Sequence, residues 1–265
     1  RSLSLCIGLR RMKELDKRRY ARQIALPEIG SEGQEKLSKS AVFLLGLGGL
    51  GSPAAMYLAA AGVGKLGLMD FDHVSISNLQ RQILYDSNDL EQAKVAAAQK
   101  KLYSINRELR CESYAFPFDE DRGAALLQAF DFVIECSDNR KSKHALARAC
   151  ARTRTAYCHG GVAAFEGQVL TVVPGRTACL DCLTPFDEAA DEEVLEVSPG
   201  PLGVVPGVIG SIQATEALKF LLGIGDLLLD RLLYFNALKM EFREISLRRK
   251  ADCPCCGGKE PKLGL

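Results

Sequence analysis

The sequence predicts an α/β fold: a Rossmann-like, mostly parallel sheet with helices on both faces and an antiparallel C-terminal extension. Three observations indicate this fold. The apolar run 41–45 stops at a glycine cluster that opens a helix, as in a nucleotide-binding βαβ unit. Further apolar strands at 65–69 and 131–136 are separated by segments long enough for helices. The later strand patterns, over 155–174 and 232–247, have short turns that favour antiparallel pairing.

The glycine cluster after the first strand is the first element with chemical content. Gly46, Gly48 and Gly51 have the spacing of a dinucleotide-binding fingerprint, and Gly49 lies in the same turn. Such glycines permit a tight turn, close approach of the backbone to phosphate and close packing of helix on strand. The helix over about 52–61 would direct its free N–H groups at an anion. Close helix packing without any ligand is the alternative interpretation.

The second strand is followed by acids and then by cations. Asp70 and Asp72 end it, and Asp70 lies about 20 residues after the glycine turn, where a ribose-binding carboxylate is expected. Arg81 and Lys94 are then brought toward the same end of the sheet, with 86–89 offering caps for a helix that has Lys94 in its first turns and continues to about 106. Two cations suit a triphosphate better than the diphosphate of NAD. Ordinary surface cations are the alternative.

A carboxylate also follows the strand at 131–136. Asp138 is expected at the carboxyl end of that strand, on the ligand-binding edge of the sheet. There it could hold Mg²⁺ on a triphosphate, because hard cations take oxygen ligands and share them with phosphates. It could also cap the helix predicted over 140–152, and the two roles are compatible.

Four of the ten cysteines have metal-ligand spacing. Two C-x-x-C pairs, Cys179 with Cys182 and Cys253 with Cys256, match a closed tetrahedral zinc site with no open position for chemistry. Cys255 leaves the register of the second pair open, and redox pairs are the alternative. The remaining cysteines are scattered in mostly apolar surroundings, which favours a reducing, cytoplasmic compartment.

Length and composition describe a single enzyme-sized domain. We expect it to span 1–265, with an N-terminal helical arm (1–39), a nucleotide-binding half (40–150) and a second half (151–265) that contains an acidic crossover loop (183–202). The net charge of +1 gives no overall field to attract nucleic acid or an anionic membrane. No apolar run approaches the ~20 residues that span a bilayer, so we expect neither partner.

Taken together, these motifs resemble the MoeB/ThiF/HesA family of adenylating enzymes, relatives of the ubiquitin-activating enzymes. The matching residues are Arg19-Tyr20-x-Arg22-Gln23, the 46–51 turn, Asp70-x-Asp72-x-Val74-x-x-Ser77-Asn78-Leu79-x-Arg81-Gln82, Lys94, Ser137-Asp138-Asn139 and the paired cysteines.

The resemblance implies adenylation by ATP of a small ubiquitin-like sulfur-carrier protein that ends in Gly-Gly, bound by the second half of the chain. The glycine carboxylate of the carrier would attack the α-phosphate and release pyrophosphate. By the resemblance, the expected roles are nucleotide binding by the glycine turn with Asp70, Asp72 and Gln82, phosphate binding by Asn78, Arg81 and Lys94, and Mg²⁺ binding by Asp138. In a homodimer, Arg22 would reach the site of the neighbouring subunit.

One departure from the family pattern affects the expected product. Many relatives carry a cysteine in the crossover loop, whereas no cysteine occurs here between Cys182 and Cys253. We therefore expect an enzyme that stops at the adenylate and leaves sulfur delivery to a donor protein. Two other functions stay open: a zinc-stabilised interaction module with a vestigial nucleotide site, and an NAD-dependent oxidoreductase that uses the same glycine turn.

Overall fold

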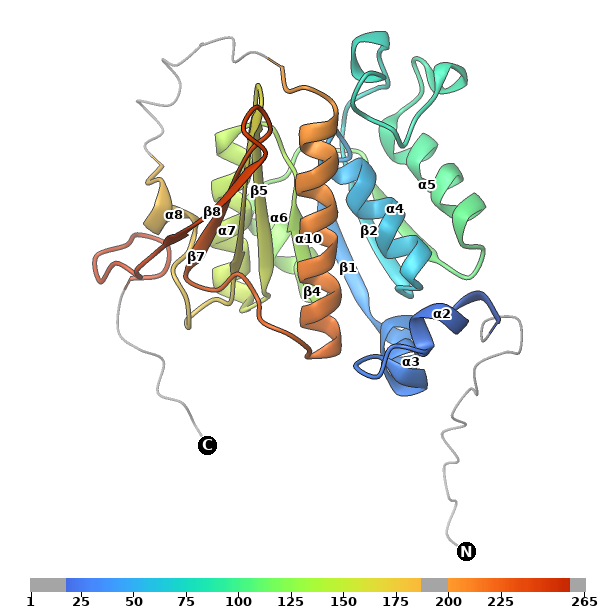
Figure 1. Cartoon of the computed structure of the whole chain (residues 1–265). Helices are drawn as coiled ribbons and strands as arrows, with labels where there is room; N and C mark the ends of the chain where they lie inside the picture. Colours follow the sequence, from blue (N-terminus) through green and yellow to red (C-terminus); the bar gives the residue numbers. More distant parts are fainter. Residues whose placement is uncertain (1–17, 187–199, 258–265) are drawn as a thin grey trace, which may run out of the picture.

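The computed structural model describes residues 18–186 and 200–257 and confirms the α/β fold (Figure 1). Its centre is one eight-stranded sheet with the order β3-β2-β1-β4-β5-β6-β7-β8. The strands are β1 (Ala41–Leu45), β2 (Lys65–Met69), β3 (Arg110–Tyr114), β4 (Phe132–Glu135), β5 (Tyr157–Ala163), β6 (Glu166–Val172), β7 (Arg231–Asn236) and β8 (Glu241–Ser246).

The sheet has a parallel half and an antiparallel half, as predicted. Strands β3, β2, β1, β4 and β5 are parallel, and β5 to β8 pair antiparallel. Short turns join β5 to β6 and β7 to β8, whereas residues 173–230 lie between β6 and β7. The change of direction follows from chain length, because β5 and β6 are joined by only two residues, and a parallel pair needs a crossover of a dozen or more.

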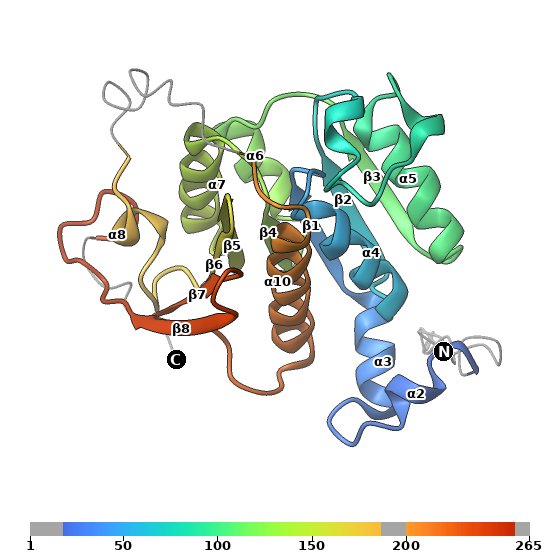
Figure 2. The ribbon, with the colours of Figure 1, turned by 45° about the horizontal axis from the view of Figure 1, so that its top comes forward.

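Helices cover both faces of the sheet. The helices are α2 (Ala21–Ile24), α3 (Gly30–Lys39), α4 (Gly51–Ala61), α5 (Lys94–Ile105), α6 (Glu120–Leu127), α7 (Arg140–Thr153), α8 (Leu180–Leu183) and α10 (Val204–Leu222), with short 3₁₀ turns η1 (Ile76–Asn78) and η2 (Ser87–Asp89). Figures 1 and 2 show α4 and α10 on one face and α6 and α7 on the other.

Alternation along β1 explains the two covered faces. Val42 and Leu44 belong to the apolar core beneath α4 and α10, whereas Phe43 and Leu45 belong to the core beneath α6 and α7. Because successive side chains of a strand point to opposite faces, a strand buried on both faces must be apolar throughout. All five residues of β1 are buried, which is why the sequence pattern identified it.

The expected boundaries differ from the structure at several element ends. Residues 86–89 do not cap α5; they form η2, in which Asp86 and Asp89 make a reciprocal capping box. Helix α6 begins at Glu120, because the side chain of Asp119 accepts a hydrogen bond from Arg122 N and caps its first turn. The central part of the predicted crossover loop, 187–199, lies outside the described residues, and the division into a helical arm and two halves stays a prediction.

Helix α10 is apolar around most of its circumference and lies against α4, β4 and β5. Its buried Gln213 donates hydrogen bonds to the carbonyl oxygens of Glu135 (2.8 Å) and Cys158 (3.2 Å), so α10 also fixes the ends of two central strands. Within 18–186 and 200–257, no helix combines the length and apolar character needed to cross a bilayer.

Candidate functional site

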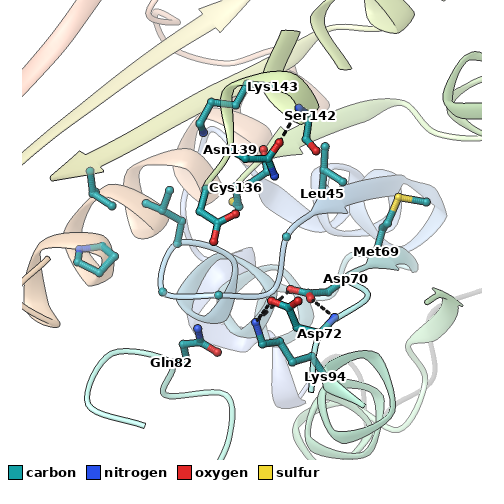
Figure 3. A pocket seen from close by; sticks show the side chains of 18 of the residues that line it. Leu45, Met69, Asp70, Asp72, Gln82, Lys94, Cys136, Asn139, Ser142 and Lys143 are labelled. Carbon is teal, nitrogen blue, oxygen red and sulfur yellow. Dashed lines mark hydrogen bonds and ion pairs between the residues drawn. The ribbon is translucent and has the colours of Figure 1, made fainter. Parts of the chain in front are cut away.

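A cavity of about 650 Å³ lies at the carboxyl ends of β1, β2, β4 and β5 (Figure 3). The sheet order reverses there, because the chain proceeds from β1 to β2 and β3 on one side and returns to β4 on the other. Ligands of open α/β sheets bind at such a reversal. The predicted residues that line the cavity are Gly46, Gly48, Gly49, Asp70, Asp72, Arg81, Gln82, Lys94 and Asp138.

Gly46, Gly48 and Gly51 occupy their positions in the turn for different structural reasons. Gly46 has φ +92°, and a Cβ there would lie 2.6 Å from the carbonyl oxygen of Cys136. A Cβ on Gly51 would lie 2.1 Å from the carbonyl oxygen of Gly46, so Gly51 lets α4 start directly behind the turn, outside the cavity lining. Gly48 faces the cavity, and the nearest atom to its Cβ would be 3.5 Å away on Gln82. The turn therefore leaves its open side toward a ligand.

The acids after β2 hold the glycine turn and Lys94 together. The Asp70 carboxylate accepts hydrogen bonds from Leu47 N at 2.8 Å and Asp72 N at 3.0 Å. The buried ammonium of Lys94 lies 2.8 Å from Asp72 Oδ2 and 3.8 Å from Asp70 Oδ2. Burial raises the pKa of Asp70, and the charge of Lys94 opposes that shift. Asp70 therefore also fixes the turn itself, a role that the sequence did not indicate.

The segment after η1 carries two more lining residues. The guanidinium of Arg81 donates to Ser77 O at 3.0 Å. The Gln82 side chain is buried, and its Oε1 accepts no hydrogen bond from the described part of the chain, as expected of an acceptor reserved for a ligand. Asn78 does not line the cavity; its carbonyl oxygen accepts from Arg81 N (3.0 Å) and Gln82 N (2.9 Å) and so positions both residues.

Asp138 follows β4 and is exposed at the cavity. Its carboxylate makes no hydrogen bond or ion pair with residues 18–186 or 200–257. The helix cap considered for it is supplied instead by Asn139, whose side-chain oxygen accepts from Ser142 N at 2.8 Å. Asp138 is therefore free of a capping role.

Sequence reasoning missed a buried polar network beside Asp138. Glu135, the last residue of β4, is fully buried and accepts hydrogen bonds from Ser137 N (2.7 Å), Ser137 Oγ (2.5 Å), Lys143 Nζ (2.8 Å) and His159 Nδ1 (2.8 Å). Burial alone would raise the pKa of Glu135, but Lys143 and His159 outweigh it and lower the pKa to about 2. Burial lowers the pKa of His159, and its hydrogen bond to Glu135 opposes that shift. A glutamate ending the apolar strand 132–135 was the available signal.

Arg22 lies far from the cavity of its own chain. It is exposed on α2, whose neighbour Gln23 donates to Ala61 O, at the far end of α4, at 3.0 Å. Helix α4 starts at the glycine turn, and its 11 residues span about 16 Å. Figure 1 shows α2 and α3 at the end of the sheet opposite the cavity.

The predicted cysteine cluster is assembled in the structure. The Sγ atoms of Cys179, Cys182, Cys253 and Cys256 lie within 4.8 Å of one another. Neighbouring pairs are 3.4 to 3.9 Å apart, close to the ~3.8 Å expected between thiolates at ~2.3 Å from one tetrahedral ion. In the structure Cys256 rather than Cys255 lies with the other three cysteines, as in the predicted register. None of the four cysteines lines the cavity.

Comparison with known proteins indicates the family of this chain. The model of the ThiF family matches residues 20–255. The sulfur carrier protein adenylyltransferase of Thermus thermophilus is 38% identical over 258 residues, which cover 96% of this chain and 94% of that protein. The SAMP-activating enzyme E1 of Haloferax volcanii is 39% identical, with 90% and 88% covered. The adenylyltransferase and sulfurtransferase MOCS3 of Bos taurus is 41% identical, and the matched region is about half (53%) of its length.

Solved structures show the same fold. Escherichia coli MccB crystallised with MccA-N7isoASN has a TM-score of 0.80 at 23% identity, covering 90% of this chain and 75% of that one. MccB with ATP has a TM-score of 0.74 at 23% identity, covering 84% and 68%. At this identity the likeness concerns the fold alone. With the family model spanning nearly the whole described chain, and a full-length relative at 38% identity, this protein belongs to the ThiF family.

Proposed function

We propose that this protein is an ATP-dependent adenylyltransferase that acts on the C-terminal glycine carboxylate of a small ubiquitin-like sulfur-carrier protein. The observation that carries the proposal is the placement of Arg81, Lys94 and Asp138 around one glycine turn. Two cations and a free carboxylate exceed what a diphosphate needs, and they suit MgATP. The names of the Thermus and Haloferax relatives support the same chemistry.

The reaction needs no side-chain nucleophile. A carboxylate oxygen of the carrier forms a bond to the α-phosphorus of ATP, the bond from that phosphorus to the bridging oxygen breaks, and pyrophosphate leaves. Arg81 and Lys94 stabilise the charge that develops on the phosphoryl oxygens. The cavity does contain a thiol, but burial and the charge of Glu135 raise the pKa of Cys136 well above its ordinary value. Cys136 is thus a poor nucleophile, in line with an enzyme that stops at the adenylate.

Asp138 is the residue that we assign to Mg²⁺. Its carboxylate is exposed at the cavity and makes no bond within the described ranges, so its oxygens fit a hard cation shared with phosphates. When bound, the ion would supply positive charge that offsets part of the phosphate charge. We assign Asp70, Asp72 and Gln82 to the nucleoside and the phosphates together with the glycine turn.

We assign Zn²⁺ to the four-cysteine cluster. Four thiols at tetrahedral spacing fit a closed structural site, which would join α8 to the segment after β8. Between the first two cysteines, buried Asp181 contacts His144 of α7, so the cluster is also tied to the helix that follows Asp138. Such a thiolate site needs a reducing compartment, and we propose the cytoplasm.

We further propose a homodimer in which Arg22 enters the site of the neighbouring subunit. Its exposed position far from its own cavity supports this role, since an arginine at that end of the sheet can act only on another molecule. An arginine donated in trans accelerates related phosphoryl transfer by ~10³-fold or more. Sulfur would come from a separate donor protein, because no cysteine occurs between Cys182 and Cys253.

The test is carrier-dependent exchange of labelled pyrophosphate into ATP. The purified protein with MgATP and a Gly-Gly-ended carrier should catalyse exchange, and Arg81→Ala and Asp138→Ala should abolish most of it. A wild-type protein that shows no exchange with any such carrier would contradict the proposal. If the site is vestigial, both variants will leave the protein's activity unchanged. An NAD-dependent oxidoreductase would instead bind NAD tightly and ignore ATP.

A further inference from the structure

Lys143 supplies a cation on the side of the cavity opposite Lys94 (Figure 3). Its side chain is 14% exposed, and its ammonium donates to Glu135 Oε2 at 2.8 Å and to Gly160 O at 3.0 Å. Glu135 is itself held by three further hydrogen bonds, from Ser137 and His159. The position of the ammonium is therefore fixed from β4, β5 and α7 at once.

A gain in stability is a poor explanation for the burial of this ion pair. Removing two charges from water is unfavourable, and well-packed apolar residues in the place of a buried pair are often equally stable. A fixed ammonium, however, offers something that apolar residues cannot. It has three N–H donors, and the structure shows partners for two of them, Glu135 and Gly160. Within residues 18–186 and 200–257 the third donor has no partner, so it is available to a ligand in the cavity that Lys143 lines.

The surroundings of Lys143 favour a narrow peptide over a nucleotide. Next to Gly160, whose carbonyl oxygen accepts from Lys143, the lining includes Gly161 and Val162 of β5, which carry no charge. A Cβ on Gly161 would lie 3.1 Å from the Gln168 side chain, so a larger residue there would have to displace that side chain by a few tenths of an ångström. A lining of glycine and valine suits an extended backbone with no side chains. A glycine tail has that shape, and its one formal charge is the terminal carboxylate.

Charge balance points to the same ligand. The Lys143 ammonium is already compensated by ionised Glu135, so the pair is neutral and presents a single oriented N–H. Such a donor matches a carboxylate with one negative charge. The more highly charged phosphates are better served by Arg81, whose guanidinium bonds only the Ser77 carbonyl within the described ranges.

We propose that Lys143 binds the terminal carboxylate of the carrier's Gly-Gly tail and orients it toward the α-phosphate. The proposal builds on the proposed function and adds a substrate-binding residue to it. Glu135 and His159 are positioning residues that hold Lys143. The carboxylate would accept the third N–H of the ammonium, while the glycine-lined wall leaves room for the backbone behind it.

The experiment compares one carrier in two forms, with a free C-terminal carboxylate and as the C-terminal carboxamide. The probe is a carrier that supports pyrophosphate exchange or, failing that, a synthetic decapeptide ending in Gly-Gly. Wild-type protein should bind the carboxylate form roughly 10- to 100-fold more tightly, as expected for a charge-assisted hydrogen bond. Lys143→Gln should reduce this ratio to near one and leave the affinity for MgATP within twofold. Lys143→Arg should keep most of the ratio.

Lys141→Gln is the matched control, since it removes the same charge from an exposed position on the same helix and should keep the wild-type ratio. If Lys143→Gln does not fold, the double variant Glu135→Gln with Lys143→Met removes both charges and gives the same comparison. An unchanged ratio, or a loss that falls on MgATP affinity instead, overturns the proposal. Absence of exchange with every carrier contradicts the adenylation proposal. The ratio of carboxylate to carboxamide affinity, measured with the decapeptide, still tests whether Lys143 binds the carboxylate.

Discussion

Replacing Gly46 and Gly48 separately by alanine should distinguish the role of the glycine turn in folding from its role in nucleotide binding. At Gly46 the backbone has φ +92°, and a left-handed conformation disfavours alanine by about 1–2 kcal/mol. Its Cβ would also lie 2.6 Å from Cys136 O and would have to move by several tenths of an ångström, which adds about 1–3 kcal/mol of overpacking. We expect Gly46→Ala to lower the free energy of unfolding by about 2–5 kcal/mol.

Gly48→Ala is the matched comparison. Its Cβ would lie 3.5 Å from Gln82 Nε2, an ordinary contact, so stability should change by less than about 1 kcal/mol. The methyl group would instead occupy the face that a phosphate approaches, and we expect MgATP affinity to fall about tenfold or more. Urea denaturation without nucleotide measures the first effect, and titration calorimetry with MgATP measures the second. Equal destabilisation by both variants, or wild-type stability of Gly46→Ala, would refute this reasoning.

Three further predictions concern the carboxylates and the cysteines. The pKa of Glu135 falls from 4.5 to about 2 on folding, which corresponds to about 3 kcal/mol of stability above pH 4.5. That stability is lost as the pH falls toward 2. Urea unfolding should therefore show Glu135→Gln to be less stable than wild type at pH 7, and the difference should narrow at pH 3. Cys256→Ser should lose bound zinc and several degrees of melting temperature, whereas Cys255→Ser should keep both. Metal analysis and thermal melting with and without EDTA measure these effects. Equal losses in the two variants would show that Cys256 is not the fourth ligand. Asp138→Asn should reduce pyrophosphate exchange about 100-fold. Its melting temperature should stay within 2 °C of wild type, because the Asp138 carboxylate has no partner in the described chain. A large drop in melting temperature would show a structural role instead.

Most of the parallel half of the fold could be predicted because its strands are buried on both faces. An apolar run such as β1 has few other uses, and the glycines after it mark the turn. The cavity acids could also be predicted, since Asp70 and Asp138 follow strands whose carboxyl ends meet at one edge of the sheet. Local turns were harder, because Asp138 and Asn139 are both good capping residues and only the start of α7 decides between them.

Contacts between distant segments account for what the sequence did not reveal. The pairing of Lys143 with Glu135 depends on how α7 is rotated over β4, and the contact of His159 with Glu135 depends on the β4–β5 register. Neither contact can be predicted from a local sequence pattern. The choice of Cys256 over Cys255 likewise depends on the course of the chain after β8. Asn78 matched the motif, yet its carbonyl rather than its side chain makes the contacts to its neighbours.

The pairing of β1 with β4 has a consequence for the order of folding. The two strands meet across a separation of 90 residues, marked by the hydrogen bond from Ala41 N to the Asp131 side chain. Closing so long a loop is slow compared with forming the neighbouring β1–α4–β2 unit. We therefore expect the wall with the glycine turn to form early and the wall with Asp138 and Lys143 to join it late. A chain arrested between these stages would have a nucleotide turn but nothing opposite it, so tight nucleotide binding should report the completed sheet.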